Sequence, residues 1–297
     1  MTRKPTFRAL ALILPLVLTT SLASNALAAD AVSGASHAKK KATEAVSTEQ
    51  YDATTSASIV PEKLRQKVKA TGFTDSTKKK VLVVIGDPRT ESLEWDMVNT
   101  AVAHFEARGL EVEVRDLYAL DFNPVMTRKT FFNAKDGFGK TPKAIAVEQG
   151  FVKKADHIIF AYPNWHDSPN AITKGYIERV FAKEFAYRNK PDGKGLEGLL
   201  KGKTLYTIMN AGWVGQGRGD VGDGISKDGG KSNPIWDKYL SAYKVVDDDT
   251  AGFWAMQNLG RFVNDQTPRN DDPQYKEKVE ELRKTLRDRL DRVYGLK

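Results

Sequence analysis

The chain has 297 residues, 40% of them hydrophobic and 28% charged, which is the composition of a globular protein and excludes a wholly disordered or fibrous chain. Its formal net charge is +8. The basic residues are scattered and do not form a stripe with interleaved aromatics, which argues against a nucleic-acid-binding surface. The sequence has no cysteine, which excludes disulfide bonds and attachment of a lipid through cysteine.

The N-terminus has the layout of a secretory signal peptide. Basic residues precede an apolar run over residues 9–23, and small residues at 26–28 offer a cleavage site. This run is short for a membrane-spanning helix, so we expect cleavage near Ala28 and export to the periplasm or beyond, with an uncleaved anchor as the alternative. The expected organisation is a signal peptide, a tail and one folded domain, over residues 1–28, 29–77 and 78–297.

The tail is rich in Ala, Ser, Thr and Lys, which predicts a flexible segment. It repeats the pattern D-x-x-[ST]-[GS]-A-[ST] at residues 30–36 and 52–58. Each copy resembles the motif on which bacterial flavin transferases attach FMN, through a phosphoester, to a terminal Thr or Ser. The resemblance implies covalent FMN on Ser36 and Ser58 and a flavin transferase as partner, although the terminal residue of that motif is usually Thr. The alternative is a linker whose composition produces such strings by chance.

The first part of the domain predicts two strands and two helices. The apolar run over residues 81–86 is typical of a strand buried on both faces. Residues 87–92 form a turn into a helix with an apolar stripe from Leu93 to Phe105. Residues 110–118 alternate apolar and charged side chains, which predicts a strand at the sheet edge. A polar loop then leads to a short helix over residues 143–152.

The centre of the chain repeats the strand, loop and helix arrangement. The apolar run over residues 157–162 predicts a third buried strand. Pro163 is expected to end this strand, and a polar loop follows. Pro169 suits the start of a helix, whose apolar stripe is expected to run from Ile172 to Phe185.

The last part of the chain predicts two further strands and two helices. A connector over residues 187–200 precedes a fourth strand over 203–209. The glycine-rich segment 212–230 predicts a mobile lid or a disordered loop. Its aspartates lack the spacing and late Glu of a calcium loop, so no metal site is expected. The final helix has one apolar face, which favours packing on a sheet over a coiled coil. The remaining elements, a helix, a fifth strand and that final helix, are expected over residues 234–246, 249–259 and 273–294.

Alternating strands and helices predict an α/β fold, with a parallel sheet covered by helices on both faces. In a five-stranded sheet of order 2-1-3-4-5, ligands bind in the crevice at the carboxyl ends of strands 1 and 3. Three loops would line this crevice, at residues 87–92, 163–167 and 210–213. The arrangement suits a flat ring against one loop and a phosphate on a helix N-terminus at another.

Four segments together resemble one family. YPNWHDSPNAITKGYIERVF, from Tyr162, is similar to the flavin-ring loop and following helix of flavodoxin-like NAD(P)H:quinone oxidoreductases. The resemblance extends to KVLVVIGDP from Lys80, GLEVEVRDLYALDFNPVM from Gly109 and LLKGKTLYTIMNAG from Leu199. It implies a flavodoxin-like three-layer sandwich, FMN as cofactor with FAD as the alternative, and NAD(P)H as electron donor. It also implies a quinone or similar small redox acceptor and, because relatives are commonly dimers, a homodimer.

The resemblance also implies which residues hold the flavin. His166 would be catalytic, by donating to the reduced flavin or protonating a quinone, and the alternative is a surface histidine with no role. His157, in a buried strand, is expected to be a satisfied core residue. The three loops would contribute, in order, Asp87, Pro88, Arg89, Thr90 and Ser92; Pro163, Asn164, Trp165 and His166; and Asn210, Ala211, Gly212 and Trp213.

The phosphate loop departs from the family pattern. Asp87 replaces a His, Glu94 replaces an Asn, and Glu91 is an added acid. Because carboxylates repel a phosphate dianion, we expect free FMN to bind weakly, and a flavin already esterified through its phosphate to be tolerated better. Ordinary stabilisation of a helix N-terminus is the favoured account of Glu91 and Glu94 themselves. The Tyr and His with which relatives assist hydride transfer have no counterpart between residues 213 and 234.

Three functions are compatible with these patterns. The first is an exported flavin-dependent oxidoreductase that reduces a quinone or similar acceptor, although nicotinamide cofactors are cytoplasmic, so the donor stays open. The second is an extracytoplasmic electron-transfer module with covalently tethered FMN, a redox partner protein and no NAD(P)H turnover. The third is a flavin-free binding protein that retains the fold.

Overall fold

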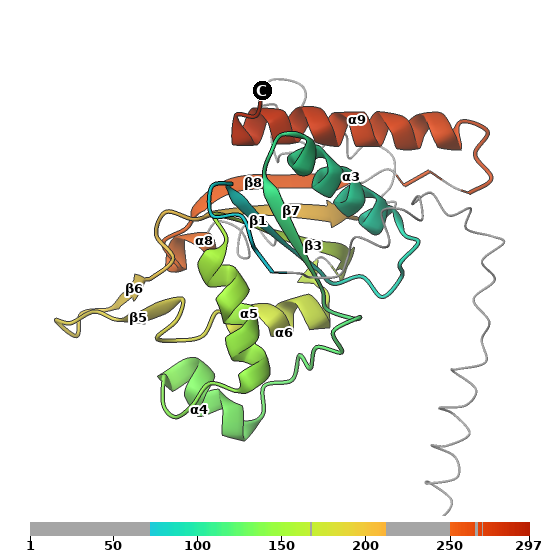
Figure 1. Cartoon of the computed structure of the whole chain (residues 1–297). Helices are drawn as coiled ribbons and strands as arrows, with labels where there is room; N and C mark the ends of the chain where they lie inside the picture. Colours follow the sequence, from blue (N-terminus) through green and yellow to red (C-terminus); the bar gives the residue numbers. More distant parts are fainter. Residues whose placement is uncertain (1–71, 167, 212–249, 265–266, 269) are drawn as a thin grey trace, which may run out of the picture. The chain divides into compact units, whose positions relative to one another are not determined.

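The computed structural model describes residues 72–166, 168–211, 250–264, 267–268 and 270–297 (Figure 1). Several expected features lie outside the described residues: the signal peptide, Ser36 and Ser58, Gly212 and Trp213, the glycine-rich segment and the helix at 234–246. Within the described part, no helix has the length and apolar character needed to cross a membrane.

Five parallel strands form the central sheet in the order β2-β1-β3-β7-β8, which confirms the predicted order 2-1-3-4-5. A short strand, β4 (Ser168–Pro169), pairs antiparallel with β3, and a separate hairpin joins β5 (Tyr187–Asn189) to β6 (Leu196–Gly198). The five parallel strands are β1 (Lys80–Ile85), β2 (Glu111–Asp116), β3 (His157–Trp165), β7 (Thr204–Asn210) and β8 (Gln257–Asn264).

Helices cover both faces of the sheet (Figure 1). On one face lie α3 (Leu93–Ala107) and α9 (Tyr275–Tyr294), which pack on Val81, Val83 and Ile85 of β1. On the other face lie α5 (Lys143–Lys154), α6 (Ala171–Val180) and the short α8 (Thr250–Phe253). Successive residues of the central strands therefore face two different cores, which explains their unbroken apolar runs.

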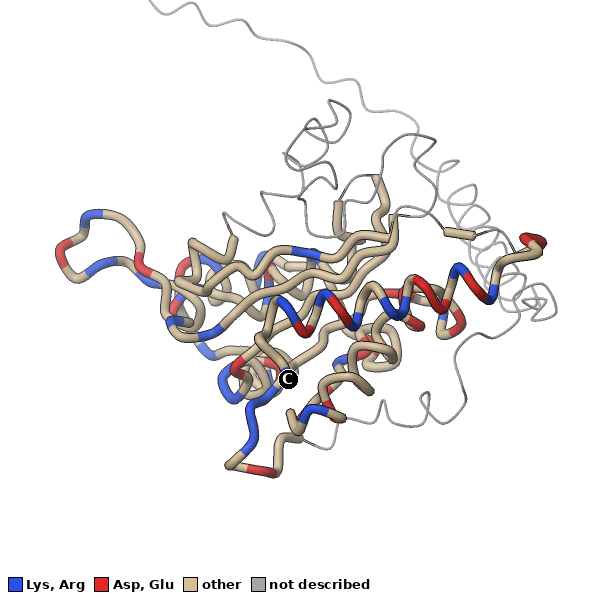
Figure 2. The backbone as a smooth tube through the Cα atoms, turned by 90° about the horizontal axis from the view of Figure 1, so that it is seen from above, with Lys and Arg blue, Asp and Glu red and all other residues tan. Residues whose placement is uncertain are grey.

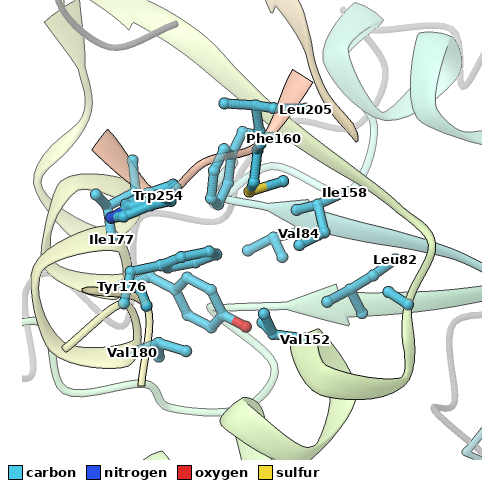
Figure 3. Close-up of a cluster of buried hydrophobic side chains, with 14 of the residues drawn as sticks. Leu82, Val84, Val152, Ile158, Phe160, Tyr176, Ile177, Val180, Leu205 and Trp254 are labelled. Carbon is cyan, nitrogen blue, oxygen red and sulfur yellow. The ribbon is translucent and has the colours of Figure 1, made fainter. Parts of the chain in front are cut away.

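The core beneath α6 is built from aromatic and branched side chains (Figure 3). Tyr176, Ile177 and Val180 of α6 pack toward the strand residues Val84 and Phe160. Charged residues are interspersed along the described chain (Figure 2).

The predicted fifth strand is present as β8, but its predicted bounds, 249–259, are wrong. Residues 250–253 form α8, and β8 begins only at Gln257. Ala251 and Trp254 are buried from a helical turn, and Ala255 then takes a left-handed φ of 60°, which reverses the chain before the strand. The apolar residues Ala251, Phe253 and Trp254 therefore belong to α8 and the turn after it, and not to the strand.

Helix α6 ends at Val180, whereas the predicted apolar stripe runs to Phe185. Glu184 takes a left-handed φ of 64°, so Phe181 and Phe185 pack from an irregular turn. The expected polar loop before residue 143 contains a helix, α4 (Arg128–Asp136), which has a Thr127–Thr130 capping box and a left-handed Gly137 at its end. Only Ala134 of α4 is buried, so the helix has no apolar stripe that could have identified it.

The folded domain begins earlier than the boundary expected at residue 78. Phe73 is buried in the core and contacts Phe151 edge to face. The Glu111 carboxylate accepts hydrogen bonds from the backbone N–H groups of Thr74 and Asp75. These contacts attach the segment before β1 to the edge strand β2.

Candidate functional site

The loops predicted to line the crevice do meet at the carboxyl edge of the sheet. Strands β1 and β3 are neighbours up to the pair Ile85–Ala161, and the Gly86 N–H donates to the Ala161 carbonyl at 2.9 Å. On the other side of β3, Pro163 pairs with Asn210 at the end of β7. In open α/β sheets this edge is where ligands bind.

Strand β3 does not end at Pro163, as predicted, but continues to Trp165 and turns back as β4. The proline is tolerated because β1 pairs with β3 only as far as Ala161, so on that side Pro163 needs no N–H donor. The hairpin places Trp165 at its tip with 43% of its surface exposed, and His166 beside it is exposed with a φ of 54°. Trp165 and His166 are therefore both exposed at the tip of this hairpin, at the carboxyl end of β3.

The start of α6 holds this hairpin against the end of β1. Asn170 is the N-cap of α6, its side chain accepts from Thr173 N at 3.3 Å, and its amide donates to the Gly86 carbonyl. A side chain at Gly86 would lie 2.0 Å from the Thr173 hydroxyl oxygen, so only glycine allows this approach. The glycine fixes the spacing between the first loop and the ring loop.

The first loop folds around its own carboxylate. Asp87 is buried, and its oxygens accept from the Arg89 N–H at 3.0 Å and from the Ser92 hydroxyl at 2.6 Å. Ser92 is the N-cap of α3, and its oxygen accepts from Trp95 N at 3.2 Å. Arg89 pairs with Asp87 at 3.4 Å from a half-exposed side chain. Of the predicted phosphate-loop residues, Pro88, Arg89 and Thr90 are exposed, and Asp87 and Ser92 are buried.

Glu94, an acid of the first turn of α3, is fully buried. Its Oε2 accepts the Asn210 N–H at 2.7 Å, and its Oε1 has no partner among the described residues. Burial raises the pKa of the Glu94 carboxyl well above its usual range, and the charge of Asp87 raises it further. Glu94 therefore links the first turn of α3 to the end of β7.

A third acid, Asp116, lies at the end of β2 and was not singled out from the sequence. It accepts hydrogen bonds from the N–H groups of Tyr118 and Ala119. Burial raises the pKa of Asp116, and the charge of Asp87 again adds to the effect. Three acidic side chains, those of Asp87, Glu94 and Asp116, thus lie in or near the loop that was expected to receive a phosphate.

The third loop is turned toward β8. The Asn210 side-chain oxygen accepts from the Asn264 amide at 3.0 Å and from the Thr267 hydroxyl at 3.1 Å, and Ala211 N donates to the Asn264 carbonyl. His157 bonds to the Thr204 hydroxyl at 2.8 Å. This partner confirms that His157 is a satisfied structural residue at the opposite edge of the sheet.

The two ends of the crevice differ in what they can hold. The exposed hairpin offers Trp165 as a surface for a flat ring. The first loop instead keeps a buried carboxylate where a phosphate would bind, with one half-exposed arginine as its partner. Two like unit charges 4 Å apart repel by about 4 kcal/mol at an effective dielectric constant of about 20. A phosphate dianion therefore does not fit this loop.

Comparison with known proteins places the chain in a family. A family model described as flavodoxin-like fold matches residues 79–286. An uncharacterized NAD(P)H oxidoreductase from Haemophilus influenzae is 36% identical over 107 residues, which cover 36% of this chain and 51% of the relative. NAD(P)H dehydrogenase [quinone] 1 from Cavia porcellus is 33% identical over 37% of this chain and 45% of its own. The chain thus spans about half the length of these two relatives.

Matches that cover more of the chain point to the same fold and family. Ribosyldihydronicotinamide dehydrogenase [quinone] from Mus musculus is 32% identical over 50% of this chain and 70% of its own length. The structure of an NAD(P)H:quinone oxidoreductase from Methanothermobacter marburgensis superposes with a TM-score of 0.51 at 15% identity, over 71% of this chain and 98% of that one. An FMN-dependent NADH-azoreductase from Bacillus anthracis, solved with FMN, gives 0.50 at 16% identity, over 72% and 99%. The chain belongs to the flavodoxin-like NAD(P)H:quinone oxidoreductase family.

Proposed function

We propose that this protein is a flavin-dependent oxidoreductase that transfers electrons from NAD(P)H to a quinone or similar small acceptor. The observation that carries the proposal is the carboxyl edge of the sheet where β1 and β3 end side by side, with Trp165 and His166 exposed just after β3 pairs with β1. The names of the curated relatives supply the reaction class. A signal peptide cleaved near Ala28 would place this activity outside the cytoplasm.

The ring-end residues have distinct tasks in this proposal. Trp165 would pack against the bound ring and exclude water from it. His166 would supply a proton to the ring or to the acceptor. A bound flavin supplies the redox chemistry, since it accepts a hydride or single electrons. Asn170 and Gly86 keep the hairpin at a fixed distance from the first loop.

Trp165→Ala is expected to lower kcat/KM for quinone-dependent NADH or NADPH oxidation by about tenfold, because lost ring packing of about 1.4 kcal/mol corresponds to that factor. The measurement is steady-state oxidation of each nucleotide with added flavin. Phe253→Ala is the matched control, because Phe253 is an exposed aromatic of α8, which precedes β8 and lies away from the crevice. Absence of nucleotide oxidation by the unaltered protein would refute the NAD(P)H-dependent activity.

A second function is favoured by the tail, in which two motifs follow an export signal. In this function, FMN attached to Ser36 and Ser58 relays electrons to a redox partner protein, without NAD(P)H turnover. A flexible tether would hold the flavin at high local concentration where free cofactor diffuses away.

The tail has its own test, which does not depend on activity. Protein expressed with its signal and a flavin transferase is expected to lose its first 28 or so residues and to gain one or two FMN groups by intact mass. The Ser36→Ala, Ser58→Ala double variant is expected to gain none. Equal masses for the variant and the unaltered protein, corrected for the two substitutions, would remove the tether from the proposal.

A further inference from the structure

Acidic side chains are buried in and around the first loop of the crevice. Asp87 and Glu94 have 1% and 0% of their surfaces exposed, and Asp116 is also buried. Arg89 is the cation paired with Asp87, and 47% of its side chain is exposed. The Asp87 carboxylate is buried, so its charge is screened less than that of an exposed carboxylate and acts on whatever binds at this end.

Four hydrogen-bond donors of this end are already bonded to the protein. The Arg89 N–H and the Ser92 hydroxyl both donate to Asp87, and the Asn210 N–H donates to Glu94. The Trp95 N–H, in the first turn of α3, donates to the Ser92 side chain. A phosphate monoester that uses the Arg89 N–H or the Ser92 hydroxyl would have to displace the Asp87 carboxylate.

We infer that this site selects a flavin whose ribityl end carries no phosphate dianion. Riboflavin and an FMN joined through its phosphate as a diester share this property. The inference rests on the proposed flavin-dependent function and adds the chemical form of the cofactor to it. Asp87 is the specificity-determining residue, because its buried carboxylate accepts hydrogen bonds from the Arg89 N–H and from Ser92, the N-cap of α3.

The test compares three flavins on the full chain purified without flavin: riboflavin, the FMN methyl ester as a phosphodiester, and FMN. Quenching of flavin fluorescence gives each dissociation constant. Riboflavin and the methyl ester are expected to bind at least about tenfold more tightly than FMN, in line with the charge repulsion at Asp87. If riboflavin binds tightly and the diester does not, free riboflavin is the cofactor; comparable binding of the two leaves the tethered form available to the site.

Variants identify the residue responsible. Asp87→Asn retains the shape of the side chain and is expected to tighten FMN binding about tenfold, with riboflavin changed less than about twofold. Arg89→Gln should weaken FMN binding and leave riboflavin binding unchanged. Glu106→Gln is the control, because it removes a negative charge near the far end of α3, about 20 Å from the start of that helix. Circular dichroism of each variant verifies that it is folded.

The outcomes separate this inference from the proposed function. FMN binding as tightly as riboflavin to the unaltered protein, or no response of FMN binding to Asp87→Asn, overturns the inference and leaves flavin-dependent activity intact. Failure of all three flavins to bind overturns the flavin-dependent function itself, and the inference with it.

Discussion

Replacing Gly175 with alanine is expected to lower the free energy of unfolding by about 2–3 kcal/mol, the cost of forcing a methyl group into a packed core. Gly175 is buried in α6, and an added Cβ would lie 2.4 Å from the Pro124 carbonyl oxygen and 2.6 Å from its Cα. These are backbone atoms of the loop after β2, and this loop is also held by Arg179, which donates to the Asn123 carbonyl. Neither side can rotate away, so the helix or the loop must shift.

Gly150→Ala is the matched control for this experiment. Gly150 lies in α5 with nothing within 4 Å of an added Cβ, so alanine there should stabilise by about 0.5–1 kcal/mol through helix propensity alone. Urea unfolding followed by circular dichroism gives both values. Because α6 begins at the Asn170–Gly86 contact, Gly175→Ala should also weaken flavin binding. Equal stability of the two glycine variants would contradict the close packing of α6 on Pro124.

The sheet could be predicted because its strands leave few alternatives. Strands β1, β3 and β7 are apolar on both faces, and a strand of that kind is stable only inside a parallel sheet with helices on either side. The apolar face of α9 was equally decisive, since Leu286 and Leu290 are fully buried against that sheet. Apolar patterns that extend over many residues thus predicted a sheet with helices on both faces.

Short elements could not be predicted, because non-local contacts decide them. The hairpin from β3 to β4 involves four residues, and its register depends on the end of β1 beside it. Helix α4 is held by a capping box and by contact with α6, with a single buried residue of its own. The break between α8 and β8 depends on a left-handed alanine, which propensity disfavours.

The loops that form the site could be predicted, but the burial of Glu94 among them could not. The three loops follow from strand order, and their acidic departure from the family pattern was visible in Asp87 and Glu94. The position of Glu94 was not visible, because an acid in the first turn of a helix normally faces solvent. Its hydrogen bond to Asn210 spans 116 residues of sequence, and only the folded sheet brings the two together.

Glu148→Ala is expected to be the most destabilising substitution considered for this protein, with a loss of about 3–5 kcal/mol, because it leaves a buried charge without its partner. Glu148 of α5 receives two hydrogen bonds from Arg115 of β2, at 2.9 and 2.5 Å, and both side chains are more than nine-tenths buried. The Tyr176 hydroxyl donates to the same carboxylate at 3.3 Å, and the guanidinium lies 4.2 Å from the Phe151 ring centre. The ion pair therefore joins the edge strand to α5 and α6, beneath the loops that form the crevice.

Two further variants test whether burial of the ion pair causes this loss of stability. Arg115→Met together with Glu148→Leu should recover most of the lost stability, because apolar replacement of both partners removes the buried charge and retains the volume. Glu178→Ala breaks the exposed Lys174–Glu178 pair on the neighbouring helix and should lose no more than about 0.5 kcal/mol. Denaturant midpoints for the three variants give the comparison. A Glu148→Ala loss as small as that of Glu178→Ala would mean that water reaches Arg115, and that the edge strand is not attached to the helical layer by a buried charge pair.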